Sequence, residues 1–132
     1  MPRTISLSLF GLVALFAAAV LATPASAASA SLSCQVIPST SGSSTNVCGT
    51  FRAASSYVID NAVQGGPASG YDWHVPSGTK VVGGCNSTTP FCDLSVRAAA
   101  RDREFVTSVG VPGSGTLSVT AVLPAVCGAF LC

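Results

Sequence analysis

Charged side chains are scarce in this sequence. Six Lys and Arg residues and five Asp and Glu residues together make up 8% of its 132 positions. Affinity for phosphate is built from clustered Lys and Arg, and the basic and acidic residues after residue 27 balance one another. We therefore expect no nucleic-acid partner and, once an amino-terminal export signal is removed, no membrane partner.

Histidine occurs once, so His74 is the only side chain expected to act as a general base near neutral pH. Asp72 would share its strand face, which makes an Asp–His pair geometrically possible, but polar residues at alternate positions also suit a solvent-facing strand. No Gly-x-Ser-x-Gly motif is present. The one close carboxylate pair, Asp102 and Glu104, could serve glycoside hydrolysis. Arginines lie beside both residues, which is more typical of a solvent-exposed turn. We predict no catalytic residues and no enzyme activity.

Metal-binding and cofactor-binding motifs are also missing. Structural zinc sites need two close Cys/His pairs, and the sequence has no Cys-x-x-Cys. The Gly83-Gly84 pair, Gly113 and Gly115 could cradle an anion, but turn geometry accounts for them with fewer assumptions. We predict neither a metal site nor a cofactor.

The amino terminus has the pattern of an export signal. Met1-Pro2-Arg3 carries one positive charge, residues 5–22 are almost entirely apolar, and Ala25-Ser26-Ala27 fits the small-x-small site of a signal peptidase. We predict a signal peptide over residues 1–27; cleavage at Ala28-Ser29-Ala30, or retention as a membrane anchor, stays open.

Removal of this signal leaves residues 28–132, enough for a single domain. In this part five basic and five acidic residues balance. Its composition is rich in Ser, Thr, Gly, Ala and Val and poor in Leu, Glu and Lys, which favours strands and turns over helices. The protein is expected to be secreted or periplasmic.

Cysteine is the abundant reactive residue, with six copies, all after the predicted signal. An even number in a short exported chain indicates a disulfide framework. Six cysteines allow fifteen connectivities, but the spacing favours pairing of neighbours. The predicted bridges are Cys34 with Cys48, Cys85 with Cys92, and Cys127 with Cys132.

Short runs of β composition follow one another, separated by turn residues. The expected strands cover residues 31–37, 46–54, 71–75, 79–82, 91–98, 104–111 and 116–123. Leu94 and Val96 are predicted core residues and Trp73 is expected to point inward, whereas Tyr57-Val58-Ile59 is a strand continuation or an edge. Residues 98–103 form a turn or a short helix. About seven short strands predict an all-β sandwich.

The order of these segments resembles bacterial secreted immunoglobulin-like and PKD-like domains. The resemblance covers residues 31 to about 126 and rests on Gly70-Tyr71-Asp72-Trp73, residues 91–96, residues 105–111 and Leu117-Ser118-Val119-Thr120. It implies an immunoglobulin-like antiparallel β-sandwich of about seven strands, stapled by disulfides, with a binding, spacing or adhesion role. The penultimate strand lacks the cysteine and the preceding tyrosine of antibody domains.

Two functions follow from these observations. The first is a non-catalytic structural or binding domain that meets a protein or a polysaccharide through its loops or an edge strand. The second is a small effector or inhibitor that presents the Cys85–Cys92 loop to a protein target. The possible binding residues of that loop are Asn86, Ser87, Thr88, Thr89, Pro90 and Phe91. Phe130 and Leu131 are expected to plug the core, with an exposed apolar knob as the alternative.

Overall fold

The computed structural model describes residues 29–132, and the predicted signal peptide, residues 1–27, lies outside them. This part of the chain contains strands and no helix. The strands are β1 (Ser31–Ile37), β2 (Val47–Gly49), β3 (Ser56–Gln64), β4 (Asp72–His74), β5 (Lys80–Gly84), β6 (Phe91–Arg97), β7 (Arg103–Val111), β8 (Gly115–Leu123), β9 (Val126–Cys127) and β10 (Phe130–Leu131). Residues 98–102, for which a short helix was the alternative, are a non-helical connection.

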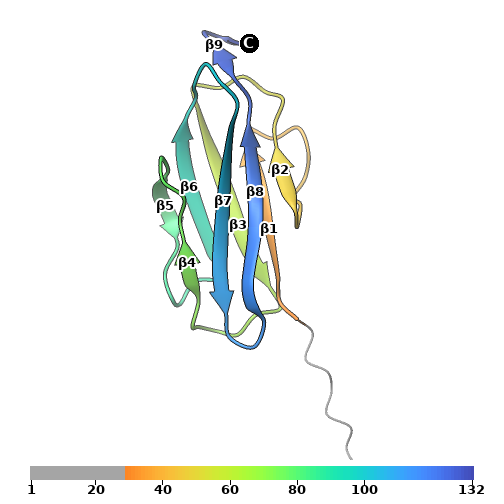
Figure 1. The fold of residues 1–132 in the computed structure, drawn as a ribbon, viewed down its shortest axis with the longest axis vertical. Coiled ribbons are helices and arrows are strands. Elements are labelled where there is room, and N and C mark those ends of the chain that lie inside the picture. Colours follow the sequence, from red (N-terminus) through yellow and green to blue (C-terminus); the bar gives the residue numbers. More distant parts are fainter. Residues whose placement is uncertain (1–28) are drawn as a thin grey trace, which may run out of the picture.

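Two four-stranded sheets pack face to face, so the predicted all-β sandwich is confirmed (Figure 1). The first sheet has the order β1-β3-β6-β5 and the second β2-β8-β7-β4. All neighbours are antiparallel except β2 and β8, which are parallel. The described residues thus place eight strands in the sandwich, against about seven expected, and β9 and β10 form a separate small hairpin.

Alternation of apolar and polar residues builds the core between the sheets. On β6 the side chains of Leu94 and Val96 are buried, as predicted, and so is that of Cys92, while their neighbours face outward. The inward positions of the other long strands follow the same rule: Leu32, Cys34 and Val36; Tyr57, Ile59, Asn61 and Val63; Phe105, Thr107, Val109 and Val111; Val119, Ala121 and Leu123. Trp73 is partly buried against this core.

Strand β3 is longer and more central than its sequence suggested. It lies between β1 and β6, and the predicted fragment Tyr57-Val58-Ile59 is only its first third. The polar side chains of Asp60 and Asn61 interrupt the apolar pattern in the sequence. Asn61 nevertheless points inward, and its Nδ2 donates to the Cys92 carbonyl at 2.9 Å. Because this bond gives the buried amide group a partner, β3 continues through the polar residues.

A buried tyrosine fixes the entry into β3. The Tyr57 hydroxyl donates to the Arg52 carbonyl at 2.8 Å and accepts a bond from the Ala54 N–H at 3.2 Å. Immunoglobulin-like sandwiches use a similar tyrosine at a corner before the penultimate strand. Here Tyr57 makes its contacts at the start of β3, at a position that the sequence pattern did not indicate.

The three predicted disulfides are confirmed: Cys34–Cys48, Cys85–Cys92 and Cys127–Cys132. No cysteine is left for zinc, and three disulfides indicate an oxidising environment. The Cys34–Cys48 bridge joins β1 of one sheet to β2 of the other. Beside it, Cys34 and Ser44 exchange two backbone hydrogen bonds of 2.8 Å, so the crossing from one sheet to the other is held at two points.

The expectation that Phe130 and Leu131 plug the core is wrong. Phe130 is 77% exposed and Leu131 is 40% exposed. The cause is the hairpin itself: β10 pairs only with β9, and Leu123 and Val126 already close this end of the core. The Cys127–Cys132 ring therefore carries two exposed apolar side chains, at the end of the domain where Figure 1 shows β9 and the C-terminus.

Replacing both Cys34 and Cys48 with Ala should lower the free energy of unfolding by about 3 kcal/mol, the chain-entropy value for a loop of this length. Urea denaturation measures the change, and the matched control is the Cys127→Ala/Cys132→Ala pair in the exposed hairpin. We expect the control to lose less in global unfolding, because its hairpin adds little to the core. Equal losses would show that the sheet-to-sheet bridge has no special weight.

Candidate functional site

The predicted binding loop connects β5 to β6 and is closed at its base. Cys85 and Cys92 are bonded, and the Cys85 N–H donates to the Phe91 carbonyl at 2.9 Å. Cys85 has a φ of 60°, a conformation that only a few non-glycine residues adopt. At the preceding residue, Gly84, a Cβ atom would lie 2.2 Å from the Phe91 carbonyl oxygen. The tight base thus requires glycine there.

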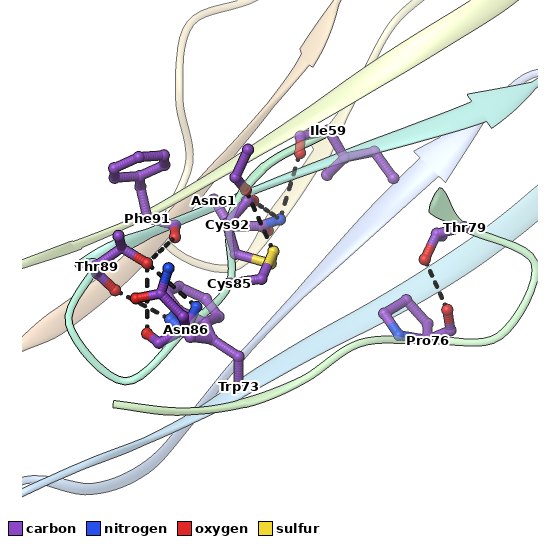
Figure 2. The surroundings of a disulfide bond; sticks show 11 residues. Ile59, Asn61, Trp73, Pro76, Thr79, Cys85, Asn86, Thr89, Phe91 and Cys92 are labelled. Atoms are coloured by element: carbon purple, nitrogen blue, oxygen red, sulfur yellow. Dashed lines mark hydrogen bonds between the residues drawn. A yellow bond between two sulfur atoms is a disulfide. The ribbon is translucent and has the colours of Figure 1, made fainter. Parts of the chain in front are cut away.

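Strand β4 and its preceding segment hold the loop from one side. The Gly70 and Tyr71 N–H groups donate to the Ser87 carbonyl at 2.7 and 3.1 Å. The Trp73 indole Nε1 donates to the Thr89 carbonyl at 3.1 Å, a contact visible in Figure 2. The half-buried tryptophan therefore serves the loop as well as the core.

Strand β3 holds the loop from the other side. The Val63 N–H donates to the Pro90 carbonyl at 2.7 Å, and the Asn61 amide reaches the Cys92 carbonyl (Figure 2). The Ser87, Thr89 and Pro90 carbonyls are consequently bonded within the domain. Most of what the loop offers to a partner is its side chains.

The tip of the loop is an Asx turn built on Asn86. Its Oδ1 accepts bonds from the Thr88 N–H at 3.0 Å and the Thr88 hydroxyl at 2.7 Å. Asn86, Ser87, Thr88 and Pro90 are exposed, Thr89 is half-buried, and Phe91 is 40% exposed. The structure thus brings the six predicted residues together in one rigid, polar protrusion.

Asp72 and His74, which the sequence pattern made a possible pair, are in contact on the outer face of the second sheet. His74 Nε2 lies 3.2 Å from Asp72 Oδ2, with side chains 63% and 77% exposed. Ser108 lies directly across from His74 on β7, a neighbour that requires knowledge of the strand register. All three belong to a flat, solvent-facing strand surface, where water competes for each group. The arrangement is typical of a surface ion pair.

An apolar cavity of about 380 Å³ lies beside the edge strand β2. Val47, Phe51, Val122 and Pro124 supply apolar walls, and Asp102 contributes a carboxylate. One oxygen of Asp102 is already used, because the Ala125 N–H donates to its Oδ1 at 2.7 Å. Phe51 is 84% exposed at this cavity, and the sequence pattern gave no sign of the site.

Two carboxylates face each other on the outer face of the first sheet. Asp60 of β3 is directly opposite Asp93 of β6. Desolvation by burial raises the pKa of Asp60; burial, followed by the charge of Asp60, raises the pKa of Asp93. Within residues 29–132, no Lys, Arg or His side chain forms a salt bridge with Asp60 or Asp93, so no direct contact with a basic group offsets this repulsion.

Comparisons with family models, with curated proteins and with solved structures found no match. The functional conclusion therefore rests on the geometry of the sites.

Residues 29–132 contain no helix with the length and apolar character needed to cross a bilayer. Over the same part of the chain, no three His, Cys, Asp or Glu side chains gather in a way that could hold a metal ion.

The Asp60–Asp93 pair predicts that acid stabilises the fold relative to neutral pH. Because the native pKa values are raised above the ordinary 3.8, the native state binds more protons than the unfolded chain just above that pH. The free energy of unfolding contributed by this pair therefore falls as the pH rises through the native pKa values. Asp93→Asn should stabilise the protein at neutral pH by about 0.2–1 kcal/mol, the range for cross-strand pairs.

Urea denaturation across the acid range measures this effect, and the gain should vanish where both carboxylates are protonated. Asp72→Asn is the matched control, since it removes an exposed aspartate that has a favourable partner. A gain from Asp72→Asn as large as that from Asp93→Asn would assign the effect to net charge and contradict the pair.

Proposed function

We propose that this chain is an exported, non-catalytic immunoglobulin-like domain that binds a protein or a polysaccharide through the loop closed by Cys85 and Cys92. The observation that carries the proposal is the immobilisation of this loop by one disulfide and by hydrogen bonds from β3 and β4. The three disulfides support export, since such bonds persist in the extracellular space and the periplasm.

The strand order supports the immunoglobulin-like type. In that fold the first, second, fifth and fourth strands form one sheet, and the third, sixth and seventh form the other. When β1 and β2 are taken as two halves of a first strand that changes sheets, the orders β1-β3-β6-β5 and β2-β8-β7-β4 follow this scheme. The disulfide differs, because Cys34–Cys48 joins the sheets at their edges and not through their central strands.

Preorganisation is the physical reason for assigning binding to the loop. A loop that is already ordered loses little conformational entropy when a partner binds. The exposed hydroxyl and amide groups of Asn86, Ser87 and Thr88 can hydrogen-bond to the hydroxyls of a sugar or to a polar protein surface. A rigid polar protrusion of this kind fits recognition better than catalysis.

Exposure of the Asp72–His74 pair supports the non-catalytic assignment. General bases gain from a site that excludes water and fixes the substrate, and this pair lies on an open strand face. The neighbouring Ser108 belongs to the same flat surface.

Backbone hydrogen bonding also separates binding from the alternative of an inhibitor. A segment that enters a protease or another sheet as an added strand uses its own N–H and C=O groups. In this loop the Ser87, Thr89 and Pro90 carbonyls are already bonded within the domain. These carbonyls could not also pair with the strand of a protease, which favours the binding role over the inhibitor role.

Asn86→Ala should weaken binding by roughly tenfold, because loss of the Asx turn lets the tip move and adds an ordering cost on binding. Asn86→Asp is the matched variant, since it keeps an acceptor for Thr88. The assay measures affinity of the exported protein for culture-medium proteins and for purified cell-wall polysaccharide. Unchanged binding by Asn86→Ala, or a hydrolytic turnover that His74→Ala abolishes, would contradict the proposal.

A further inference from the structure

The end of the sandwich opposite the Cys85–Cys92 loop gathers apolar and basic side chains. It is formed by the β2–β3 and β6–β7 connections and by the β9–β10 hairpin, and we call it the hairpin end (Figure 1). Two contacts tie the hairpin to the β6–β7 connection: the Val126 N–H donates to the Ala99 carbonyl at 2.8 Å and the Ala125 N–H donates to Asp102. The hairpin thus has a fixed position.

Four of the five basic residues in the described chain lie at this end: Arg52, Arg97, Arg101 and Arg103. Two acidic residues, Asp102 and Glu104, accompany them and leave a side-chain charge of +2. A carboxylate at Cys132 would lower this to +1 without changing its sign. The rest of residues 29–132 has Lys80 against Asp60, Asp72 and Asp93, a charge of −2.

Three of these arginines are exposed. Arg52, Arg97 and Arg101 project from the ends of strands or from a connection. Arg103 is half-buried: its guanidinium donates to the Arg97 carbonyl and lies 5.3 Å from the centre of the Phe105 ring. Since the one ion pair of residues 29–132 lies elsewhere, at Asp72 and His74, the three exposed guanidinium groups are available to an anionic partner.

Apolar side chains project from the same end. Phe130 is 77% exposed, Leu131 40% and Phe51 84%. Phe130 and Leu131 lie within a ring closed by the Cys127–Cys132 disulfide, which restricts the conformations of the hairpin. The bonds of Ala125 and Val126 to the β6–β7 connection hold the base of the hairpin on the domain. Exposed apolar residues with basic residues behind them are typical of protein surfaces that bind a membrane or another protein.

We propose that the hairpin end docks on an anionic lipid bilayer, with Phe130 and Leu131 entering the interface and Arg52, Arg97 and Arg101 contacting lipid phosphates. Charge complementarity supports an anionic surface. The hairpin extends beyond the long strands (Figure 1) and exposes Phe130. This supports a bilayer over an acidic protein, because a soft interface accepts an exposed phenyl ring without a preformed hole. This surface is distinct from the binding loop of the proposed function and lies at the other end of the domain.

Vesicle co-sedimentation with the exported protein tests the proposal. The protein should bind vesicles of equimolar phosphatidylglycerol and phosphatidylcholine, bind phosphatidylcholine vesicles much more weakly, and dissociate as salt is raised. Arg101→Gln should weaken binding about fivefold, and Phe130→Ser or Leu131→Ser by roughly tenfold. All variants share one amino terminus, so any contribution of residues 1–28 cancels.

The matched controls are Lys80→Gln, which removes a base on the edge strand β5 away from the hairpin, and Val82→Ser, which removes an exposed apolar side chain from the same strand. Lys80→Gln should weaken binding clearly less than Arg101→Gln, and Val82→Ser should bind as the wild type does. Lys80→Gln weakening binding as much as Arg101→Gln would overturn the proposal, as would unchanged binding by Phe130→Ser. A third outcome would also overturn the proposal. If the protein bound soluble polyphosphate but not vesicles, and Phe130→Ser left that binding unchanged, the arginines would bind a free polyanion and not a bilayer. Neither hairpin variant should alter recognition through Asn86, so failure here leaves the proposed function standing.

Discussion

The structure depends on how the first twenty residues of the domain cross from one sheet to the other. β1 closes the edge of the first sheet and β2 closes the edge of the second. β2 is only three residues long and pairs in parallel with β8, which is too little to hold a strand in place alone. The Cys34–Cys48 disulfide and the paired hydrogen bonds of Cys34 with Ser44 supply the missing restraint. They also keep Cys48 and Thr50 buried over the core.

Local patterns in the sequence predicted the faces of β6, β7 and β8, because alternation is a property of neighbouring residues. They failed where the deciding partner is distant in the chain. Asn61 looks like a break in a strand until the Cys92 carbonyl that receives its amide is known. Strand register decides two further features that the sequence pattern does not show. Asp60 lies opposite Asp93, and Val63, Gly70 and Trp73 donate the hydrogen bonds that fix the Cys85–Cys92 loop. Phe130 and Leu131 were misplaced because the sequence does not show that Leu123 and Val126 already fill the end of the core.

The alternating directions of the strands explain why a domain with balanced charge has one end with uncharged connections and one end with basic residues. Successive long strands reverse direction, so every second connection arrives at the same end. The connections at the loop end, residues 65–71, 85–90 and 112–114, contain no charged residue. Those at the hairpin end contain or adjoin four arginines. A net charge near zero therefore describes the whole domain and hides an asymmetry that a binding partner would encounter.

The three disulfides have different physical roles in this arrangement. Cys34–Cys48 joins two sheets through a buried core position, whereas Cys85–Cys92 and Cys127–Cys132 each close a short segment at one end. A bridge across a short exposed segment buries little apolar surface, so its main effect is to remove conformations that the segment would otherwise sample. That restriction helps folding modestly and helps recognition more, because the entropy is lost before a partner arrives. The Cys85–Cys92 and Cys127–Cys132 bridges thus fit the two proposals, in which the ends of the domain are its contact surfaces and the sheets hold these ends apart.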